Sequence, residues 1–215
     1  MDWHEWIKQS LPRTEIMRGG ATVWARGADG LIGDTLGPVM HLHDGASEIF
    51  YFLSGKCRLE VGDTEEYFDP GDFVLVPPEV PHNLWNAGDE DLLVFWIVAP
   101  HMPDDKWRTE AITGDEMKRR VVRSRVEQGA ELPSDANILS QLHNLDSGIQ
   151  LHSQTRADQE TVIYIASGQA DIKVGKLGGR LRENDFVHVP VNTAFSAVPA
   201  DGQASVLLIK MPGND

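Results

Sequence analysis

Three histidines and one glutamate in the first half of the chain have the side-chain types and the spacing of metal ligands. His41 and His43 are two residues apart, so on a strand both imidazoles would lie on one face, about 7 Å apart along the backbone. Glu48 follows after a short turn, and His82 comes from a later segment. Such a donor set suits divalent Fe, Mn, Co, Ni, Cu or Zn, and it leaves one or two coordination positions for water or substrate. We therefore expect one divalent transition metal at these residues, of an identity that the sequence does not specify.

The segments that would position these ligands occur twice in the chain. Identical residues recur at a shift of 113 positions, without a gap over about thirty residues, from Tyr51 and Tyr164 to Pro77 and Pro190. A match of this length indicates a duplicated unit. We expect an N-terminal domain with the metal site over residues 1–105, a linker over residues 106–135, and a C-terminal domain over residues 136–215.

Short alternating segments within each unit predict β-strands. We expect residues 48–53 and 56–61 to form a hairpin around the Ser54-Gly55 turn, and residues 73–76 to form the next strand. Residues 92–98 are continuously apolar, which is typical of a strand buried on both faces. Many short antiparallel strands favour a mainly β fold, as a barrel or jelly roll.

Two segments outside the repeat predict helices. Residues 2–10 place Trp3, Trp6 and Ile7 on one helical face, which could pack on a barrel or on a partner subunit. A second helix is expected over residues 115–128 in the linker. Its basic residues could bind an anion or another chain, or they could simply be solvated. They are Lys118, Arg119, Arg120, Arg123 and Arg125.

Composition narrows the classes of partner. A net charge of -14 repels phosphate backbones and anionic lipid headgroups, so we expect neither nucleic acid nor a membrane surface as a partner. The longest apolar run, residues 92–99, is too short to span a membrane, and no secretory signal is visible at the N-terminus. Cys57 is the only cysteine, which fits a reducing cytoplasm, and its alternation with Leu59 and Val61 predicts a buried structural thiol.

The spacing of the candidate ligands resembles the first motif of the cupin superfamily, G(x)5HxH(x)3-4E(x)6G. Here the motif begins at Gly37, two residues closer to the first histidine than in the family pattern. The ligand spacing itself is unchanged. The matching positions are His41, His43, Glu48 and Gly55.

The second cupin motif, G(x)5PxG(x)2H(x)3N, is also present. Gly71, Pro77, His82 and Asn86 fall at its positions, while Glu79 replaces the middle glycine. The resemblance covers nearly the whole first unit. It implies two tandem cupin-type β-barrels, the first with a metal near its centre. It also implies a homodimer, although two such barrels can imitate a dimer within one chain, so the oligomeric state stays open.

The second unit does not repeat the ligands. At the shift of 113 residues, Thr161 replaces Glu48 and Phe195 replaces His82. We therefore expect no complete metal site there. The second barrel would instead be structural, covering a sheet edge or shaping the mouth of the first site.

An altered site in the second unit is the alternative. His152 is the counterpart of His43, and Gln150 takes the place of His41. Together with Glu160 and His188, His152 could form a different cluster. However, Glu160 is one residue away from the matching position, and on a strand such a shift turns the side chain to the opposite face.

The cupin resemblance implies several activities, because a fold does not select a reaction. The leading hypothesis is a dioxygenase-type enzyme that acts on a small organic molecule through Fe(II) or a similar metal. A Lewis-acid isomerase, lyase or decarboxylase is the second hypothesis, and a small-ligand binding module is the third.

Catalytic residues beyond the ligands are not identified by spacing. Glu79 and His101 are candidate acids or bases, although no spacing rule places either near the metal. The residues that share strand faces with the ligands could line the pocket or simply form the barrel core. They are Phe50, Phe52, Leu84 and Asn86.

Overall fold

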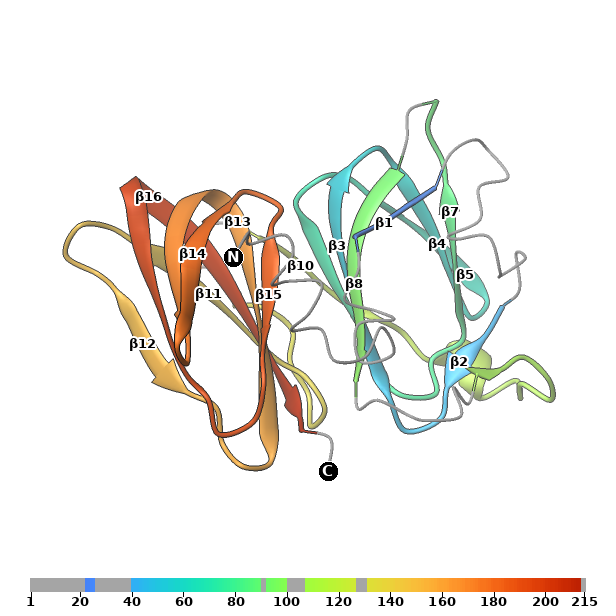
Figure 1. Ribbon diagram of the computed structural model, residues 1–215. Coiled ribbons are helices and arrows are strands. Elements are labelled where there is room, and N and C mark those ends of the chain that lie inside the picture. The colour runs from blue at the N-terminus through green and yellow to red at the C-terminus, as the bar shows by residue number, and fades with distance from the viewer. Residues whose placement is uncertain (1–21, 26–39, 90–91, 100–106, 127–130, 214–215) are drawn as a thin grey trace. The chain divides into compact units, whose positions relative to one another are not determined.

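The computed structural model describes residues 22–25, 40–89, 92–99, 107–126 and 131–213. Of these, the residues between positions 14 and 127 form one compact unit, and those between positions 128 and 215 form a second. Both units consist of antiparallel strands, which confirms the predicted mainly β fold (Figure 1). The helix expected over residues 2–10 lies outside the described residues. In the described part of the chain, no helix is long and apolar enough to cross a membrane.

The first unit contains a large and a small antiparallel sheet. The large sheet has the strand order β1-β8-β3-β6-β10, the small sheet has the order β5-β4-β7, and β2 pairs with β9. The strands are β1 (Thr22–Ala25), β2 (Leu42–His43), β3 (Ser47–Ser54), β4 (Cys57–Val61), β5 (Thr64–Phe68), β6 (Asp72–Val76), β7 (His82–Asn86), β8 (Leu92–Ala99), β9 (Trp107–Arg108) and β10 (Val122–Arg125).

Every second side chain along these strands points inward, and together these side chains form the interior of the first unit. Phe50 and Phe52 of β3 pack with Leu59 of β4 and Leu84 of β7 in one apolar cluster that draws on both sheets. Cys57 belongs to the same cluster and is fully buried, as predicted. Burial raises the pKa of its thiol, which keeps the sulfur protonated and unreactive.

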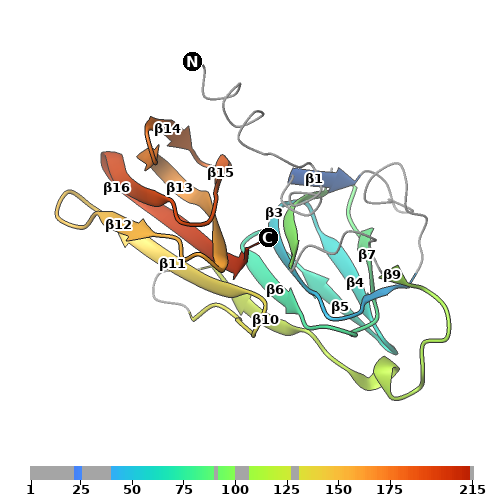
Figure 2. The same ribbon diagram turned by 60° about the horizontal axis from the view of Figure 1, so that its bottom comes forward.

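The helix predicted over residues 115–128 was wrong in the part that the structure describes. Only Glu116–Lys118 forms a single 3-10 turn (η1), and Val122–Arg125 is the strand β10. β10 pairs with β6, as Figure 2 shows, and Arg123 of β10 forms an ion pair with the buried Asp72 of β6. This backbone pairing outweighs the helical propensity of a short basic segment. Residues 107–125 therefore contribute two strands to the sheets of the first unit.

Most of the basic residues in this segment are held by acidic partners of the first unit. Arg119 pairs with Glu79, and Arg120 pairs with Asp63 at 2.7 Å. Both pairs are largely exposed, so each contributes little to stability on its own. These ion pairs hold the segment against the first unit, while its basic side chains stay largely exposed.

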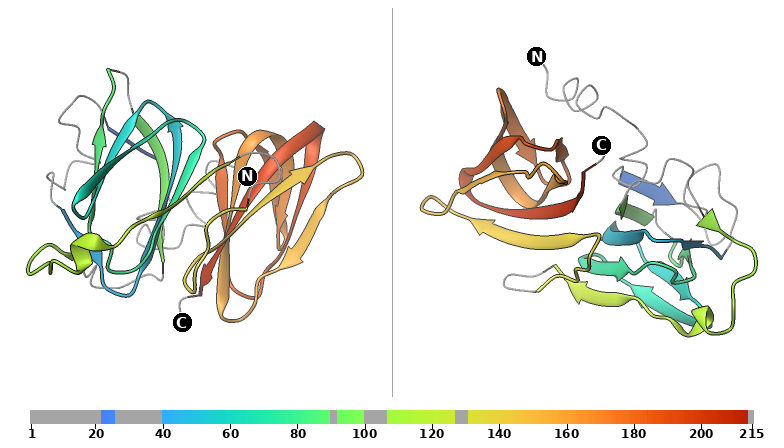
Figure 3. Two further views of the ribbon diagram at one scale, coloured as in Figure 1. Left: turned by 180° about the vertical axis from the view of Figure 1, so that it is seen from behind. Right: turned by 90° about the horizontal axis from the view of Figure 1, so that it is seen from below.

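The second unit forms one six-stranded sheet around two long strands. β16 lies between β11 and β13 and also pairs with β12, while β13 pairs with β14 and β15 (Figure 3). The strands are β11 (Leu139–Leu145), β12 (Leu151–Gln154), β13 (Gln159–Val174), β14 (Leu177–Arg182), β15 (Phe186–Val189) and β16 (Ala194–Pro212). Register shifts near the middle of β13 interrupt its pairing with β16.

The predicted repeat is visible in the strand register. Val61 pairs with His82 in the first unit, and Val174 pairs with Phe195 in the second, which preserves the shift of 113 residues on both strands. The repeat extends to backbone conformation. Glu79 has a φ of 60°, and its counterpart Asn192 has a φ of 54°. The two units therefore share a backbone plan while their side chains differ.

Candidate metal centre

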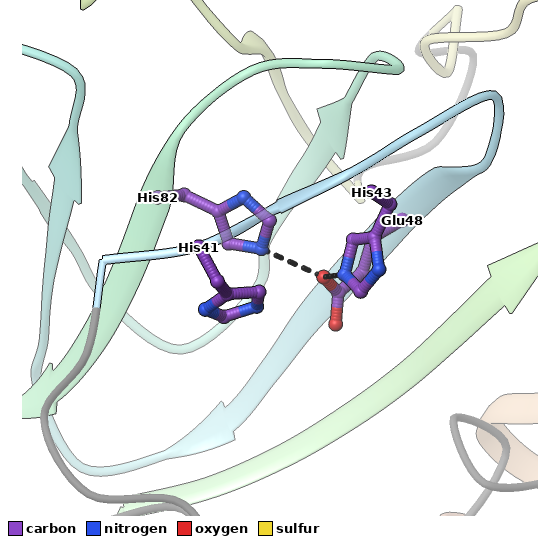
Figure 4. Close-up of side chains that lie close together, drawn as sticks. All are labelled: His41, His43, Glu48 and His82. Carbon is purple, nitrogen blue, oxygen red and sulfur yellow. Dashed lines mark hydrogen bonds and ion pairs between the residues drawn. The ribbon is translucent and has the colours of Figure 1, made fainter. Parts of the chain in front are cut away.

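The four predicted ligands come together in the first unit. One ligand atom from each of them lies within 4.8 Å of the others. Figure 4 shows the three imidazoles and the carboxylate converging from separate segments. Three of the four residues are buried, and His41 is partly exposed. The four residues are His41, His43, Glu48 and His82.

Backbone pairing explains the approach of residues that are far apart in sequence. His41 and His82 form an antiparallel bridge, in which the His82 amide donates to the His41 carbonyl at 2.8 Å. Their rings consequently lie 4.4 Å apart between centroids. His43 follows two residues after His41, and Glu48 is the second residue of β3, so these three ligands lie close together on one stretch of the chain.

Glu48 is the electrostatic centre of the cluster. Its Oε2 atom lies 3.0 Å from His43 Nε2 and 2.8 Å from His82 Nε2. Burial by itself would raise the pKa of the Glu48 carboxyl, but hydrogen bonds and charge attraction from His43 and His82 outweigh burial and lower this pKa far below its ordinary range. The carboxylate is therefore ionised whenever the protein is folded at neutral pH.

The orientation of His82 is set by a backbone group. His82 Nδ1 donates to the carbonyl oxygen of Val80 at 2.9 Å, which directs Nε2 toward Glu48. Metal-binding histidines are commonly oriented in this way by a carbonyl behind the ring. Because two ring nitrogens and a carboxylate face one point, the donor set fits a single divalent cation of the borderline transition series.

The walls beside the ligands are apolar. Val76 and Val98 pair across from Glu48, and Val61 pairs across from His82. The ring of Phe50 lies 6.1 Å from that of His82 between centroids. Phe52 and Leu84 belong to the same core cluster, while the Asn86 side chain accepts from the amide of Gly88 and so stabilises a turn.

Trp96 is a wall residue that spacing alone did not identify. It pairs with Phe50 across β3 and β8, so its indole shares the inward face with Phe50, diagonally across from Glu48. Trp96 and Val98 are only partly buried, whereas Ile97 between them is fully buried. The Trp96 Nε1 atom is itself buried and has no hydrogen-bond partner in the structure. Side chains alternate along β8, so aligning β8 with Phe50 of β3 would have predicted from the sequence that the Trp96 side chain points inward.

The two candidate acids or bases receive no support from the described geometry. The Glu79 carboxylate forms an exposed ion pair with Arg119, so it is engaged outside the cluster. His101 lies outside the described residues. Glu79 instead contributes through its backbone, because its amide donates to the His43 carbonyl at 2.9 Å.

The second unit brings no comparable group together among its described residues. Thr161 and Phe195, which replace Glu48 and His82, are both buried. Glu160 and His188 form a buried pair at 3.0 Å, but His152 is exposed and lies 3.3 Å from Gln150. The alternative cluster of Glu160, His152 and His188 is therefore not assembled.

Part of the first unit matches a known family of protein domains. Residues 33–98 match the family described as Cupin domain. An uncharacterized protein, MJ1618 of Methanocaldococcus jannaschii, is 24% identical over 94 residues, which are 44% of this chain and 62% of that protein. The match thus spans less than two thirds of the relative's own length.

Solved structures resemble a larger part of the chain. Oxalate decarboxylase from B. subtilis has a TM-score of 0.55 at 14% identity, over 82% of this chain and 65% of that one. Protein Ylba from E. coli has a TM-score of 0.61 at 15% identity, over 97% and 98% of the two chains. AerE from Microcystis aeruginosa has a TM-score of 0.56 at 15% identity, over 80% and 81%. At such identities the likeness shows the fold alone, and the family match covers residues 33–98 of the first unit.

Proposed function

We propose that this chain is a metal-dependent enzyme of dioxygenase type that acts on a small organic molecule in the first unit. The observation that carries the proposal is the convergence of three imidazoles and one carboxylate within 4.8 Å, in an interior with apolar walls. His41, His43, Glu48 and His82 would hold one divalent metal, for which Fe(II) is our first choice. When bound, such a metal polarises a substrate oxygen and supplies redox chemistry with dioxygen.

The protein's own groups would orient the substrate and keep water out. Glu48 stays ionised and offsets one of the two positive charges of a divalent ion, so the site would favour a ligand that carries one negative charge. Phe50, and Val98 across from Glu48, offer an apolar surface to the substrate body, and Trp96 offers an unused indole N–H to an oxygen. The partial exposure of His41 and Trp96 supports access from this side.

The character of the walls favours oxygen chemistry over acid–base chemistry. Val61, Val76 and Val98, which pair directly across from the ligands, cannot transfer protons. Glu79 is engaged by Arg119. A reaction that depends on the metal and its substrate is therefore better supported than one that needs a dedicated side-chain base.

A Lewis-acid decarboxylase or lyase is the second candidate. The likeness to oxalate decarboxylase in fold favours it, and Mn would suit the same donor set. We also propose, from the cupin resemblance, a cytoplasmic homodimer. Light scattering of the purified protein would test the dimer.

The function is tested by metal analysis together with oxygen uptake. The full chain is purified without a tag, its metals are measured by plasma mass spectrometry, and oxygen uptake is recorded with small catechols, diketones and organic acids. About one iron per chain with substrate-dependent uptake is expected for a single filled site. One manganese, zinc or nickel per chain without uptake, but with release of CO2 from an organic acid, would favour the second candidate. No stoichiometric metal after reconstitution would refute both.

A further inference from the structure

The inward face of the second unit carries a lysine that the first unit lacks. Lys210 pairs with Thr161 across β13 and β16. It alternates with Leu208 and Val206, which both belong to the core cluster of this unit, while Ile209 lies on the other face. The Lys210 side chain therefore leaves the strand on the inward side and is partly buried.

The position of Lys210 corresponds to a residue beside the metal ligands of the first unit. Glu48 pairs with Val98 there, and the matching pair in the second unit is Thr161 with Lys210. The replacement thus reverses the local charge, because a carboxylate is lost and an ammonium is gained. A carboxylate in this place suits a cation, whereas an ammonium suits an anion.

Lys210 is not neutralised by the described part of the protein. Its Nζ donates to Gln141 Oε1 at 3.0 Å, and no described carboxylate forms an ion pair with it. An ammonium that is partly removed from water without a counterion costs free energy, which a bound anion would recover. Gln141 lies on β11, two residues before His143 on the same inward face.

His143 supplies a second unused group. It pairs with Val206 of the core cluster, and its Nε2 atom is buried without a hydrogen-bond partner. Burial, and secondly the charge of Lys210, lower the pKa of His143, so the imidazole is neutral at pH 7. A neutral imidazole can donate through Nε2–H, and an acceptor oxygen is what this atom lacks.

We propose that the second unit binds a small organic anion of the carboxylate class, whose oxygens accept hydrogen bonds from Lys210 Nζ and His143 Nε2. The site is distinct from the candidate metal centre and does not depend on the function proposed for it. It also gives the second barrel a ligand, where the lost metal ligands alone suggest only a structural role.

The test uses the 15N-labelled full chain, freed of metal, with malonate as the probe and the uncharged malonamide as the matched ligand. Malonate is expected to shift the amide signals of β11 and of the second half of β16 in a saturable way. Malonamide should leave them unchanged. The Lys210→Met variant, which keeps the length of the side chain, is expected to weaken malonate binding by about tenfold or more, as for loss of a charge-assisted hydrogen bond.

Matched variants separate the outcomes. Lys176 is exposed in the second unit, so Lys176→Met changes the net charge equally and should bind malonate like the parent. Equal binding by both variants, or shifts scattered over the surface, would overturn the proposal. Shifts confined to the first unit would also overturn the proposal. If those shifts disappear when the titration is repeated with His82→Ala, malonate was bound at the metal ligands. Lys210→Arg, which keeps the charge, should retain binding if the Met variant folds poorly.

Discussion

Glu79 donates its backbone amide to the carbonyl oxygen of His43 at 2.9 Å, and so links the turn before His82 to the segment that carries the two ligands His41 and His43. The same residue adopts a φ of 60°, at the position where the family motif has glycine. Its side chain compensates by pairing with Arg119. The turn thus combines an unfavourable backbone conformation with a useful hydrogen bond that any residue could make.

Replacing Glu79 with glycine should preserve or raise stability. A left-handed conformation costs a residue with a side chain about 1–2 kcal/mol, whereas the exposed ion pair with Arg119 is worth at most about 1 kcal/mol. Glu79→Val should be clearly less stable than the parent. Urea unfolding measures both variants, with Glu183→Gly at ordinary φ as the destabilised control. If Glu79→Gly lost more stability than Glu79→Val, the side-chain pair would matter more than the backbone.

His82→Ala should lower metal affinity by more than about tenfold, since even loss of an outer-shell partner costs 10–100-fold in known sites. Phe195→Ala, at the equivalent position, should leave metal content unchanged while reducing stability by about 3–5 kcal/mol. Metal analysis and thermal unfolding separate the two effects. Phe195→Leu serves if the alanine variant does not fold. Equal metal loss at both positions would mean that the site is wrongly assigned.

Gly62 and Gly175 occupy equivalent turns with the same φ of 57°, but their surroundings differ. A Cβ atom on Gly62 would lie 2.0 Å from the Met117 carbonyl oxygen, whereas one on Gly175 would meet only the Thr193 methyl at 3.7 Å. Gly175→Ala should therefore cost only the conformational penalty of about 1–2 kcal/mol. Gly62→Ala should cost more, because η1 must move. Chemical unfolding compares them, and equal losses would contradict the close packing of η1.

Trp96→Phe should reduce kcat/KM for the substrate by about 5–30-fold, as expected for about 1–2 kcal/mol of lost hydrogen bonding, without changing metal content. Trp85→Phe is a matched control. Trp85 also has a buried indole nitrogen without a partner, but it stacks under Arg58 on the outward face. The same loss in both variants would indicate a general effect on packing and not a contact with substrate.

Acid should destabilise the second unit through His143. Its folded-state pKa lies below the ordinary 6.5, so the unfolded chain binds the proton first. The stability from neutral His143 is complete above pH 6.5 and is lost as the pH falls toward the folded-state pKa. Lys210→Met removes the second cause of the shift and should raise the titration midpoint of His143. NMR of the imidazole measures it, and an unchanged midpoint relative to Lys176→Met would exclude the influence of Lys210.

The sequence predicted the ligands and the repeat because both depend on local spacing along strands. Val61 and His82, and likewise Val174 and Phe195, meet in the register that the shift of 113 residues implied. Val122–Arg125 was mistaken for helix, since its strand conformation comes from pairing with β6, which lies far away in sequence. Lys210 and His143 were missed for a similar reason. Their common orientation follows from the pairing of β11, which carries His143, with β16, which carries Lys210 and lies far away in sequence.

The pairing of β2 with β9 and of β6 with β10 also bears on how the protein is made. His43 pairs with Trp107, and Leu75 pairs with Val122, so the first unit needs strands that are synthesised well after its motifs. When only residues 1–105 have been synthesised, the four ligands are present, but the strands β9 and β10 that pair with β2 and β6 are still missing. Domains generally fold as units during synthesis. The first unit should therefore complete its fold only when the chain has emerged beyond residue 125, and an isolated fragment should end there as well.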